Sequence, residues 1–484
     1  MSNQTKYDSF RRTFPEFVYE NYSYDVQPDG LHIVFTFRIG DDICFHPTAM
    51  VASRRFLQFD QPAEVLDRLV FNIGMIELVS YWKCYCPPRV RVECGALDEG
   101  QKAFWKKTYY NGLGEFFYTN GIRATMEDFM GIENGELRMG NVHTPVFDHP
   151  SKEGTGAAAN SQFSILNSQF KNDSQFSILN SQFYLLPIGG GKDSVVTLEL
   201  LSSQGWKVVP LIMNPRGATI GCIEAAGYGM DDVLVIHRSI DPLLLRLNGQ
   251  GCLNGHTPFS AMLAMYTLLA AQLSGIGNIA LSNENSANES TVVGTTVNHQ
   301  YSKSLEFEND FRHYVARYLP TGANYFSFLR PLSELQIAML FSRMERYHDV
   351  FRSCNVGSKQ DVWCGGCAKC LFAYIILSPF VEPHRLNAIF GKAMLDDEAL
   401  APLLAQLVGE AETKPFECVG TIGEVRTALQ MALRRWYADR RPTLLRDYRP
   451  TALPEVRLDT LAPDHNLSES ELTLLRNHVQ AAAF

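Results

Sequence analysis

The chain has 484 residues, a length that suggests two or three domains with ample apolar material for a core. Its net charge of −9 disfavours a nucleic-acid binder that depends on a general basic surface, and its 46% hydrophobic content is ordinary for a globular protein. The N-terminus lacks the apolar core of a signal peptide, and the longest apolar stretches, Ala261–Leu273 and Leu371–Val381, are too short to span a bilayer. We therefore expect a cytoplasmic protein without membrane insertion and without a nucleic-acid partner.

The first region, residues 1–150, contains strand and helix patterns but no phosphate-binding motif. The predicted elements are strands at Leu31–Ile39, Ile43–His46 and Arg89–Cys94 and helices at Val65–Lys83 and Gln101–Tyr110. Gly112–Ile122 is rich in glycines and aromatic residues and predicts a loop, whose rings either pack in the core or line a pocket. We expect an N-terminal α+β domain, a candidate for substrate recognition.

Residues 151–183 differ in composition from the rest of the chain. The segment Ser161–Phe170 recurs unchanged as Ser174–Phe183, close to a run of glycines and alanines. A solenoid needs several tolerant copies, so one identical pair does not indicate a solenoid. We interpret 151–183 as an inserted repetitive linker, an exposed connector between two domains without a catalytic role.

The segment Tyr184–Gln204 organises the second half of the chain. It begins with an apolar run of strand length, passes through a glycine turn at residues 189–194 and ends in a helical pattern. The turn consists of Gly189, Gly190, Gly191, Lys192, Asp193 and Ser194. A strand, a glycine turn and a helix together present bare backbone N–H groups and a positive helix end to a phosphate. An ordinary strand-to-helix turn is the alternative interpretation.

Two familiar phosphate-binding motifs do not fit this turn. A Walker loop has Ser or Thr after its lysine, whereas Lys192 is followed by Asp193. A dinucleotide-binding fingerprint ends in a glycine where this chain has Ser194.

Strand and helix patterns alternate after the turn, which predicts an α/β fold with a doubly wound parallel sheet. The predicted strands are Lys207–Met213, Val233–His237 and Gly277–Glu284, and the predicted helices are Thr219–Ala226 and Gly255–Gly275. Ligands of such sheets bind beyond the carboxyl ends of the strands. This rule places Asn214, Arg216, Asn283 and Glu284 near the glycine turn.

A polar loop follows the last of these strands and leads into a predicted helix at Leu305–Tyr318. Four polar side chains in or next to this loop are candidates for proton transfer or substrate binding. They are Glu284, His299, Lys303 and Glu306. A solvated loop tip, or a buried structural role for any one of these residues, is the alternative.

Four cysteines near residue 360 have the spacing of a metal site. They are Cys354, Cys364, Cys367 and Cys370. Four thiolates satisfy tetrahedral zinc, and a closed site of this kind is structural. A redox-active CxxC pair, unliganded thiols and a four-iron cluster would use the same residues. The eleven cysteines of the chain are consistent with cytosolic thiols and a metal site.

These patterns divide the chain into four parts. We expect an N-terminal domain at 1–150, a linker at 151–183, an α/β domain with the four-cysteine site at 184–385, and a helical C-terminal region at 386–484. A further helix is predicted at Pro331–His348.

The turn sequence GGGKDS resembles the SGGxDS loop of ATP pyrophosphatases, with Gly189 in the place of the first serine. Longer segments resemble the UDP-N-acetylmuramoyl-L-alanyl-L-glutamate epimerases of bacterial peptidoglycan synthesis. The segments are IGMIELVSYWKCYCP (73–87), GLGEFFYTNGI (112–122), PIGGGKDS (187–194), VNHQYSKSLEFE (297–308), WCGGCAKCLF (363–372) and KPFECVGT (414–421).

The resemblance implies a sheet of the ATP pyrophosphatase type, with ATP and Mg²⁺ at the glycine turn and AMP and pyrophosphate as products. It implies a UDP-N-acetylmuramoyl dipeptide as the substrate, whose terminal glutamate is inverted after activation of a carboxylate. Cyano-deazaguanine synthases are a rival family with a similar loop and four-cysteine site, but their loop usually lies near the N-terminus. A non-catalytic nucleotide-binding regulator is a third interpretation, disfavoured by the intact Lys192, Asp193 and Ser194.

Overall fold

The computed structural model of the chain describes residues 2–52, 57–58, 61–136, 183–292, 295, 297–319, 321–449 and 456–483. The linker predicted at 151–183 lies outside the described residues, apart from its last residue, Phe183, which begins a strand.

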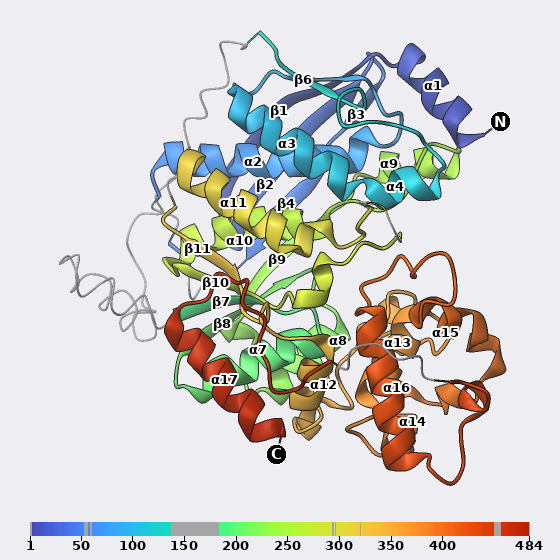
Figure 1. The fold of residues 1–484 in the computed structure, drawn as a ribbon. Coiled ribbons are helices and arrows are strands. Elements are labelled where there is room, and N and C mark those ends of the chain that lie inside the picture. Colours follow the sequence, from blue (N-terminus) through green and yellow to red (C-terminus); the bar gives the residue numbers. More distant parts are fainter. Residues whose placement is uncertain are drawn as a thin grey trace.

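One sheet of eleven strands runs through the molecule, in the order β11-β10-β7-β8-β9-β4-β2-β1-β5-β6, with β3 paired to β2 (Figure 1). The first six strands are β1 (Glu16–Gln27), β2 (Gly30–Ile39), β3 (Ile43–Phe45), β4 (Thr48–Ala52), β5 (Arg89–Val92) and β6 (Gly131–Asn134). The others are β7 (Phe183–Pro187), β8 (Lys207–Met213), β9 (Leu234–Arg238), β10 (Asn278–Leu281) and β11 (Asn324–Ser327).

The second half of the chain contributes five neighbouring strands, β11-β10-β7-β8-β9, all parallel to one another. The chain moves outward from β7 through β8 to β9, then crosses back to place β10 on the other side of β7. This order reverses direction between β7 and β10, and such a point in a parallel sheet is where ligands bind. The predicted α/β class and the mostly parallel sheet are confirmed.

The N-terminal strands extend this sheet. β4 pairs antiparallel with β9, for example Val51 with Ile236, so residues on both sides of 151–183 contribute to one continuous sheet. A buried ion pair reinforces the junction, because the guanidinium of Arg238 donates to both oxygens of Glu77 at 2.6 and 2.7 Å. Tyr266 donates a third hydrogen bond to the same carboxylate at 3.0 Å.

Helices cover both faces of the parallel half of the sheet (Figure 1). In chain order, the α-helices begin with α1 (Asn3–Thr13), α2 (Ala63–Trp82), α3 (Glu99–Gly112), α4 (Gly114–Thr119), α7 (Lys192–Ser203), α8 (Gly217–Ala225) and α9 (Pro242–Gly249). They continue with α10 (Phe259–Ser274), α11 (Leu305–Tyr318), α12 (Glu334–Phe341), α13 (Ala368–Leu377), α14 (Pro383–Phe390), α15 (Ala401–Leu407), α16 (Ile422–Trp436) and α17 (Glu469–Ala483).

One prediction for the N-terminal region is wrong. Gly112–Ile122 is not a continuous loop, because residues 114–119 form the short helix α4. Phe116 and Phe117 are buried, and the apolar area that they remove from water favours the helix despite the flanking glycines. Glu115 lies in the first turn of the same helix.

The C-terminal helices α13 to α16 form a group at the lower right of Figure 1, whereas α17 returns to the parallel sheet. Tyr184 of β7 donates a hydrogen bond to Glu471 of α17 at 3.1 Å, which joins the end of the chain to the strand before the glycine turn. Within the described ranges, no helix combines the length and the apolar character needed to cross a bilayer.

Candidate functional site

A cavity of about 580 Å³ opens beyond the carboxyl ends of β7, β8 and β10. Residues of the glycine turn line it, except Gly190. The four strand-end residues predicted to lie near the turn, Asn214, Arg216, Asn283 and Glu284, also line it. Since parallel strands end at one edge of the sheet, segments far apart in sequence meet here.

Gly190 gives the turn its shape. Its φ of +82° is a left-handed conformation that favours glycine, and a Cβ there would lie 3.0 Å from the carbonyl carbon of Ala218. A Cβ on Gly189, in contrast, would meet no atom within 4 Å. The helix α7 starts directly after Gly191, so its free N–H groups point toward the cavity end of the turn.

Lys192 is buried between two carboxylates, Asp193 at 2.5 Å and Glu334. Burial alone would lower the pKa of Lys192, but these two carboxylates outweigh it and raise the pKa, so the lysine stays charged. Burial raises the pKa of Glu334, and the nearby carboxylates of Asp193 and Glu284 raise it further, against the opposing effect of Lys192. The carboxylates of Asp193, Glu284 and Glu334 lie beside a turn that suits a phosphate. Their oxygen atoms are ligands that suit Mg²⁺.

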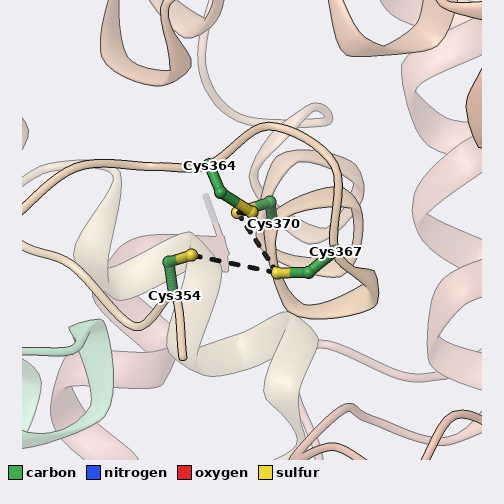
Figure 2. Close-up of side chains that lie close together, drawn as sticks. All are labelled: Cys354, Cys364, Cys367 and Cys370. Atoms are coloured by element: carbon green, nitrogen blue, oxygen red, sulfur yellow. Dashed lines mark hydrogen bonds between the residues drawn. The ribbon is translucent and has the colours of Figure 1, made fainter. Parts of the chain in front are cut away.

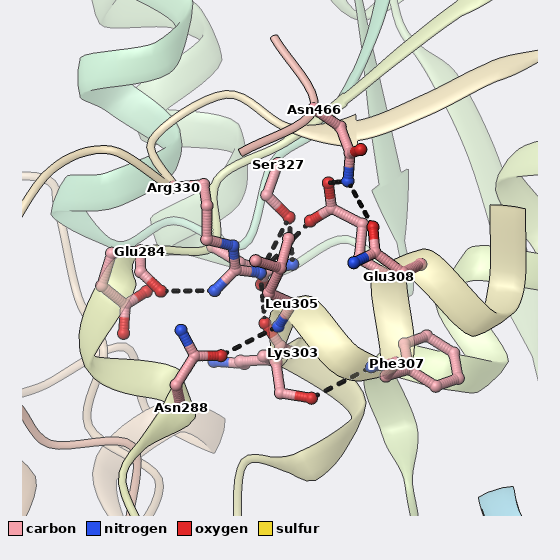
Figure 3. A network of polar contacts seen from close by, with 12 residues as sticks. Glu284, Asn288, Lys303, Leu305, Phe307, Glu308, Ser327, Arg330 and Asn466 are labelled. Carbon is pink, nitrogen blue, oxygen red and sulfur yellow. Dashed lines mark hydrogen bonds and ion pairs between the residues drawn. The ribbon is translucent and has the colours of Figure 1, made fainter. Parts of the chain in front are cut away.

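Arg330 fixes the backbone of the two segments that carry the predicted residues Glu284 and Lys303 (Figure 3). Its guanidinium is fully buried and donates to the carbonyl oxygens of Glu284 at 2.6 Å and Lys303 at 2.5 Å. Further bonds go to Ser327 and to Glu308, both at 3.2 Å. One buried side chain therefore sets the spacing between the end of β10 and the loop before α11.

His299 and Lys303 both line the cavity, so the structure brings them together with Glu284 and the glycine turn. His299 Nδ1 lies 2.5 Å from Glu115 Oε2, a contact between the loop and α4. His256 Nδ1 lies 3.6 Å from the same oxygen, and the two imidazole rings are 4.4 Å apart.

Cys418, which sequence reasoning did not single out, lines the same cavity. Its Sγ lies 3.2 Å from Lys303 Nζ. Burial alone would raise the pKa of the Cys418 thiol, but Lys303, Lys369 and His299 outweigh it and lower the pKa to about 5. Burial alone would lower the pKa of His299, but its contacts with Cys418 and Glu115 raise it to about 9. Near neutral pH the pair is thus a thiolate beside an imidazolium.

We name Glu115, His256, His299, Lys303 and Cys418 the titratable cluster. Burial, with the charges of His299 and Lys83 nearby, lowers the pKa of His256 to about 4, so this ring is neutral. The ligand atoms of Glu115, His256 and His299 lie within 4.8 Å of one another. We assign no metal there, because the ammonium groups of Lys83 and Lys303 act on the same site and repel a cation.

Glu306 is the one proton-transfer candidate that the structure places elsewhere. Its side chain is 59% exposed and pairs with Lys107 at 2.7 Å, and it does not line the cavity. The helix α11 begins at Leu305 with Ser304 as its N-cap, which directs Glu306 away from Lys303.

The four predicted metal ligands converge beside the cavity (Figure 2). Sulfur separations are 3.9 Å for Cys354–Cys367, 3.7 Å for Cys364–Cys370 and 3.5 Å for Cys367–Cys370. Tetrahedral zinc with Zn–S bonds of about 2.3 Å requires separations of about 3.8 Å, so the thiols fit this ion. A positive φ at Gly365 provides the bend between Cys364 and Cys367.

The cysteine cluster is connected to the cavity. Cys354 and Lys369 line it, and Asn355 donates a hydrogen bond to Glu417 at 2.7 Å. On the other side of Cys418, Gln300 donates to the carbonyl of Val419 at 3.3 Å. The segment that carries Cys418 is therefore held from both sides.

Two family models match this chain. Residues 9–328 match the family model described as MurL N-terminal domain, and residues 350–455 match the MurL C-terminal domain. The chain belongs to the MurL family. The first matched region carries the glycine turn, His299 and Lys303, and the second carries the four cysteines and Cys418.

Three curated relatives bear the name UDP-N-acetyl-alpha-D-muramoyl-L-alanyl-L-glutamate epimerase. The relative from Xanthomonas oryzae pv. oryzae is 32% identical over 425 residues, covering 86% of this chain and 85% of its own. A Micromonospora relative is 34% identical over 378 residues, with 77% and 76% covered. A Salinispora tropica relative is 32% identical, with 77% and 74% covered.

Proposed function

We propose that this chain is an ATP-dependent epimerase that converts the terminal L-glutamate of UDP-N-acetylmuramoyl-L-Ala-L-Glu to D-glutamate in peptidoglycan synthesis. The names of the relatives and the family assignment support the reaction and the substrate class. The observation that carries the proposal is the single cavity that joins the glycine turn to the titratable cluster. The side with the glycine turn suits a phosphate, and the side with the titratable cluster suits proton transfer. One bound molecule could contact both sides.

ATP would lie with its phosphates on the turn 189–194, against the N-terminus of α7. The parallel strand order supports a sheet of the ATP pyrophosphatase type. Asp193 and the neighbouring Glu284 and Glu334 would hold Mg²⁺, which supplies positive charge that neutralises the phosphates. Lys192 adds a fixed positive charge at the same point.

The chemistry explains why an epimerase would need a nucleotide. The α-hydrogen of a terminal glutamate is very weakly acidic, since the adjacent carboxylate resists further negative charge. Conversion of that carboxylate to an acyl-adenylate, with release of pyrophosphate, removes the charge and makes the carbonyl electron-withdrawing. A base can then remove the α-hydrogen, and a proton returned to the opposite face inverts the centre. Hydrolysis of the mixed anhydride releases AMP and makes the cycle irreversible.

The four-cysteine cluster would hold a structural zinc ion, consistent with the sulfur separations. Its residues border the cavity through Cys354 but supply no free ligand position once four thiolates are bound. The cytoplasmic location stays a prediction and matches the nucleotide substrate.

The direct experiment incubates the purified protein with ATP, Mg²⁺ and the L-Ala-L-Glu or L-Ala-D-Glu form of the UDP-muramoyl dipeptide. We expect the L-Glu form to yield AMP, pyrophosphate and, after acid hydrolysis, D-glutamate, whereas the D-Glu form should yield neither AMP nor pyrophosphate. Inversion without AMP formation would contradict the proposal.

A further inference from the structure

The position and the charge of the Cys418 thiol are those expected of a catalytic base. The proposed function itself does not require a cysteine. The residue lines the cavity that also contains the glycine turn, and its sulfur contacts the ammonium of Lys303 at 3.2 Å. His299 approaches it from the same loop, and Lys369 adds positive charge from α13. The carboxyl group of Glu417 is the acidic neighbour.

We propose that Cys418 is the catalytic base that removes the α-hydrogen of the activated glutamate, with His299 as its positioning residue and Lys303 as the cation beside both the thiolate and the activated carbonyl. This inference rests on the proposed function. In the step, the Cα–H bond breaks and an S–H bond forms. The electron pair of the broken bond passes into the carbonyl of the activated carboxyl group. The opposite face receives a proton derived from water, and the thiol returns its proton to solvent.

The contacts around Cys418 fit this role better than a structural one. A buried thiol without a strong cationic environment has a raised pKa, as Cys222 does through burial despite the nearby Arg352. Cys418 instead faces two lysines and an imidazole, the setting in which a thiolate persists at neutral pH. Glu115 completes the arrangement, since its carboxylate bonds His299 Nδ1 at 2.5 Å and keeps the ring protonated.

Lys303 links the two sides of the cavity. Its ammonium touches Cys418, and the carboxylates of Asp193 and Glu284 also act on it. A glutamyl carbonyl activated at the glycine turn would therefore lie near Lys303. Negative charge developing on its oxygen would be stabilised by that ammonium group while Cys418 takes the hydrogen.

The test separates activation from proton transfer. Cys418→Ser and Cys418→Ala are assayed in D₂O with ATP, Mg²⁺ and the dipeptide, measuring pyrophosphate release and deuterium at the glutamate α-carbon. We expect deuterium incorporation to fall by about 10²- to 10⁴-fold while pyrophosphate release stays within a few-fold of the unmodified protein. Cys44→Ala, a thiol on β3 outside the cavity lining, is the matched control and should leave both unchanged.

Deuterium incorporation at the unmodified rate in either folded Cys418 variant would overturn the role of Cys418. If the unmodified protein released no pyrophosphate with the dipeptide, the proposed function itself would fail, so the two failures are distinguishable. His299→Asn tests the positioning role, because it should move the pH midpoint of Cys418 alkylation upward. A purely structural histidine would leave that midpoint unchanged.

Discussion

The two sides of the cavity are built in different ways. The glycine turn is one contiguous segment, in which six neighbouring residues connect β7 to α7. The titratable cluster is assembled from four distant parts of the chain, with Glu115 on α4, His256 before α10, His299 and Lys303 in one loop, and Cys418 before α16. A contiguous site depends on backbone shape, whereas an assembled site depends on electrostatic contacts between segments. The two sides should therefore fail in different ways when they are altered.

The largest effect is expected from a change in backbone shape. Gly190→Val places a branched side chain at a φ of +82° and against Ala218, and so displaces the turn. Pyrophosphate release and inversion should both fall by at least about 100-fold, since misplacement of a reacting group by 1 Å costs about that much. Circular dichroism checks that the variant folds.

The control for Gly190→Val is Gly189→Ser, one residue away. A Cβ at Gly189 meets no protein atom within 4 Å, and serine is the residue of the ATP pyrophosphatase loop at this position, so this variant should release pyrophosphate at a rate close to that of the unmodified protein. Equal losses in the two variants would contradict the backbone account.

Loss of the proposed zinc ion should act on stability first. Cys370 is buried, and Cys370→Ser should reduce the zinc content below one ion per chain and lower the free energy of unfolding by about 4 kcal/mol or more. Elemental analysis and urea unfolding measure the two quantities, with Cys44→Ser as the comparison. Full stability in a metal-free protein would show that the cluster has no structural ion.

In the titratable cluster, the reactivity of Cys418 should depend on pH. Because the pKa of Cys418 is lowered to about 5, its thiolate is present above that pH and is lost as the pH falls through it. Alkylation of Cys418 by iodoacetamide should be nearly constant from pH 6 to 8 and fall about tenfold per pH unit below the midpoint. Burial raises the pKa of Cys44, so its alkylation should require alkaline pH, which peptide mapping would show. Equal pH profiles for the two thiols would remove the electrostatic argument.

The smallest effect is expected at Glu306. This side chain is mostly exposed, and its partner Lys107 also pairs with Asp310 at 2.7 Å. Glu306→Gln should change the free energy of unfolding by less than about 1 kcal/mol and leave inversion nearly unchanged. The matched change Glu284→Gln, at a buried residue lining the cavity, should lower pyrophosphate release by about tenfold or more. A greater loss of inversion in Glu306→Gln than in Glu284→Gln would contradict the conclusion that Glu284, and not Glu306, belongs to the site.

The contrast between contiguous and assembled structure also explains which elements could be predicted from the sequence. The predicted ranges of β8 and α11 coincide with the observed elements, because each has a strong apolar pattern and clear ends. The strand β1 had no predicted counterpart, since its residues EFVYENYSYDVQ mix polar groups into both faces. Its exposed end and its pairing with both β2 and β5 depend on distant segments.

The site follows the same rule. Periodicity and turn composition located the glycine turn and the strand-end residues, because these depend on local backbone. Cys418 and Glu115 carried no local signal that set them apart from other cysteines and acids. Each is distinguished only by its contact with a residue more than a hundred positions away in the chain. Cys418 contacts Lys303, and Glu115 contacts His299. Two segments could have directed attention to them: KPFECVGT, noted only for its resemblance to the epimerase family, and GLGEFFYTNGI, noted for that resemblance and as a loop that could line a pocket.

The central claim is that activation at the glycine turn enables proton exchange at the other side of one cavity. The most direct measurement is the entry of solvent deuterium into the α-position of the dipeptide's glutamate in D₂O, with and without ATP. We expect deuterium incorporation only when ATP and Mg²⁺ are present, together with AMP formation. Incorporation without ATP, or inversion that retains the original α-hydrogen, would contradict this claim.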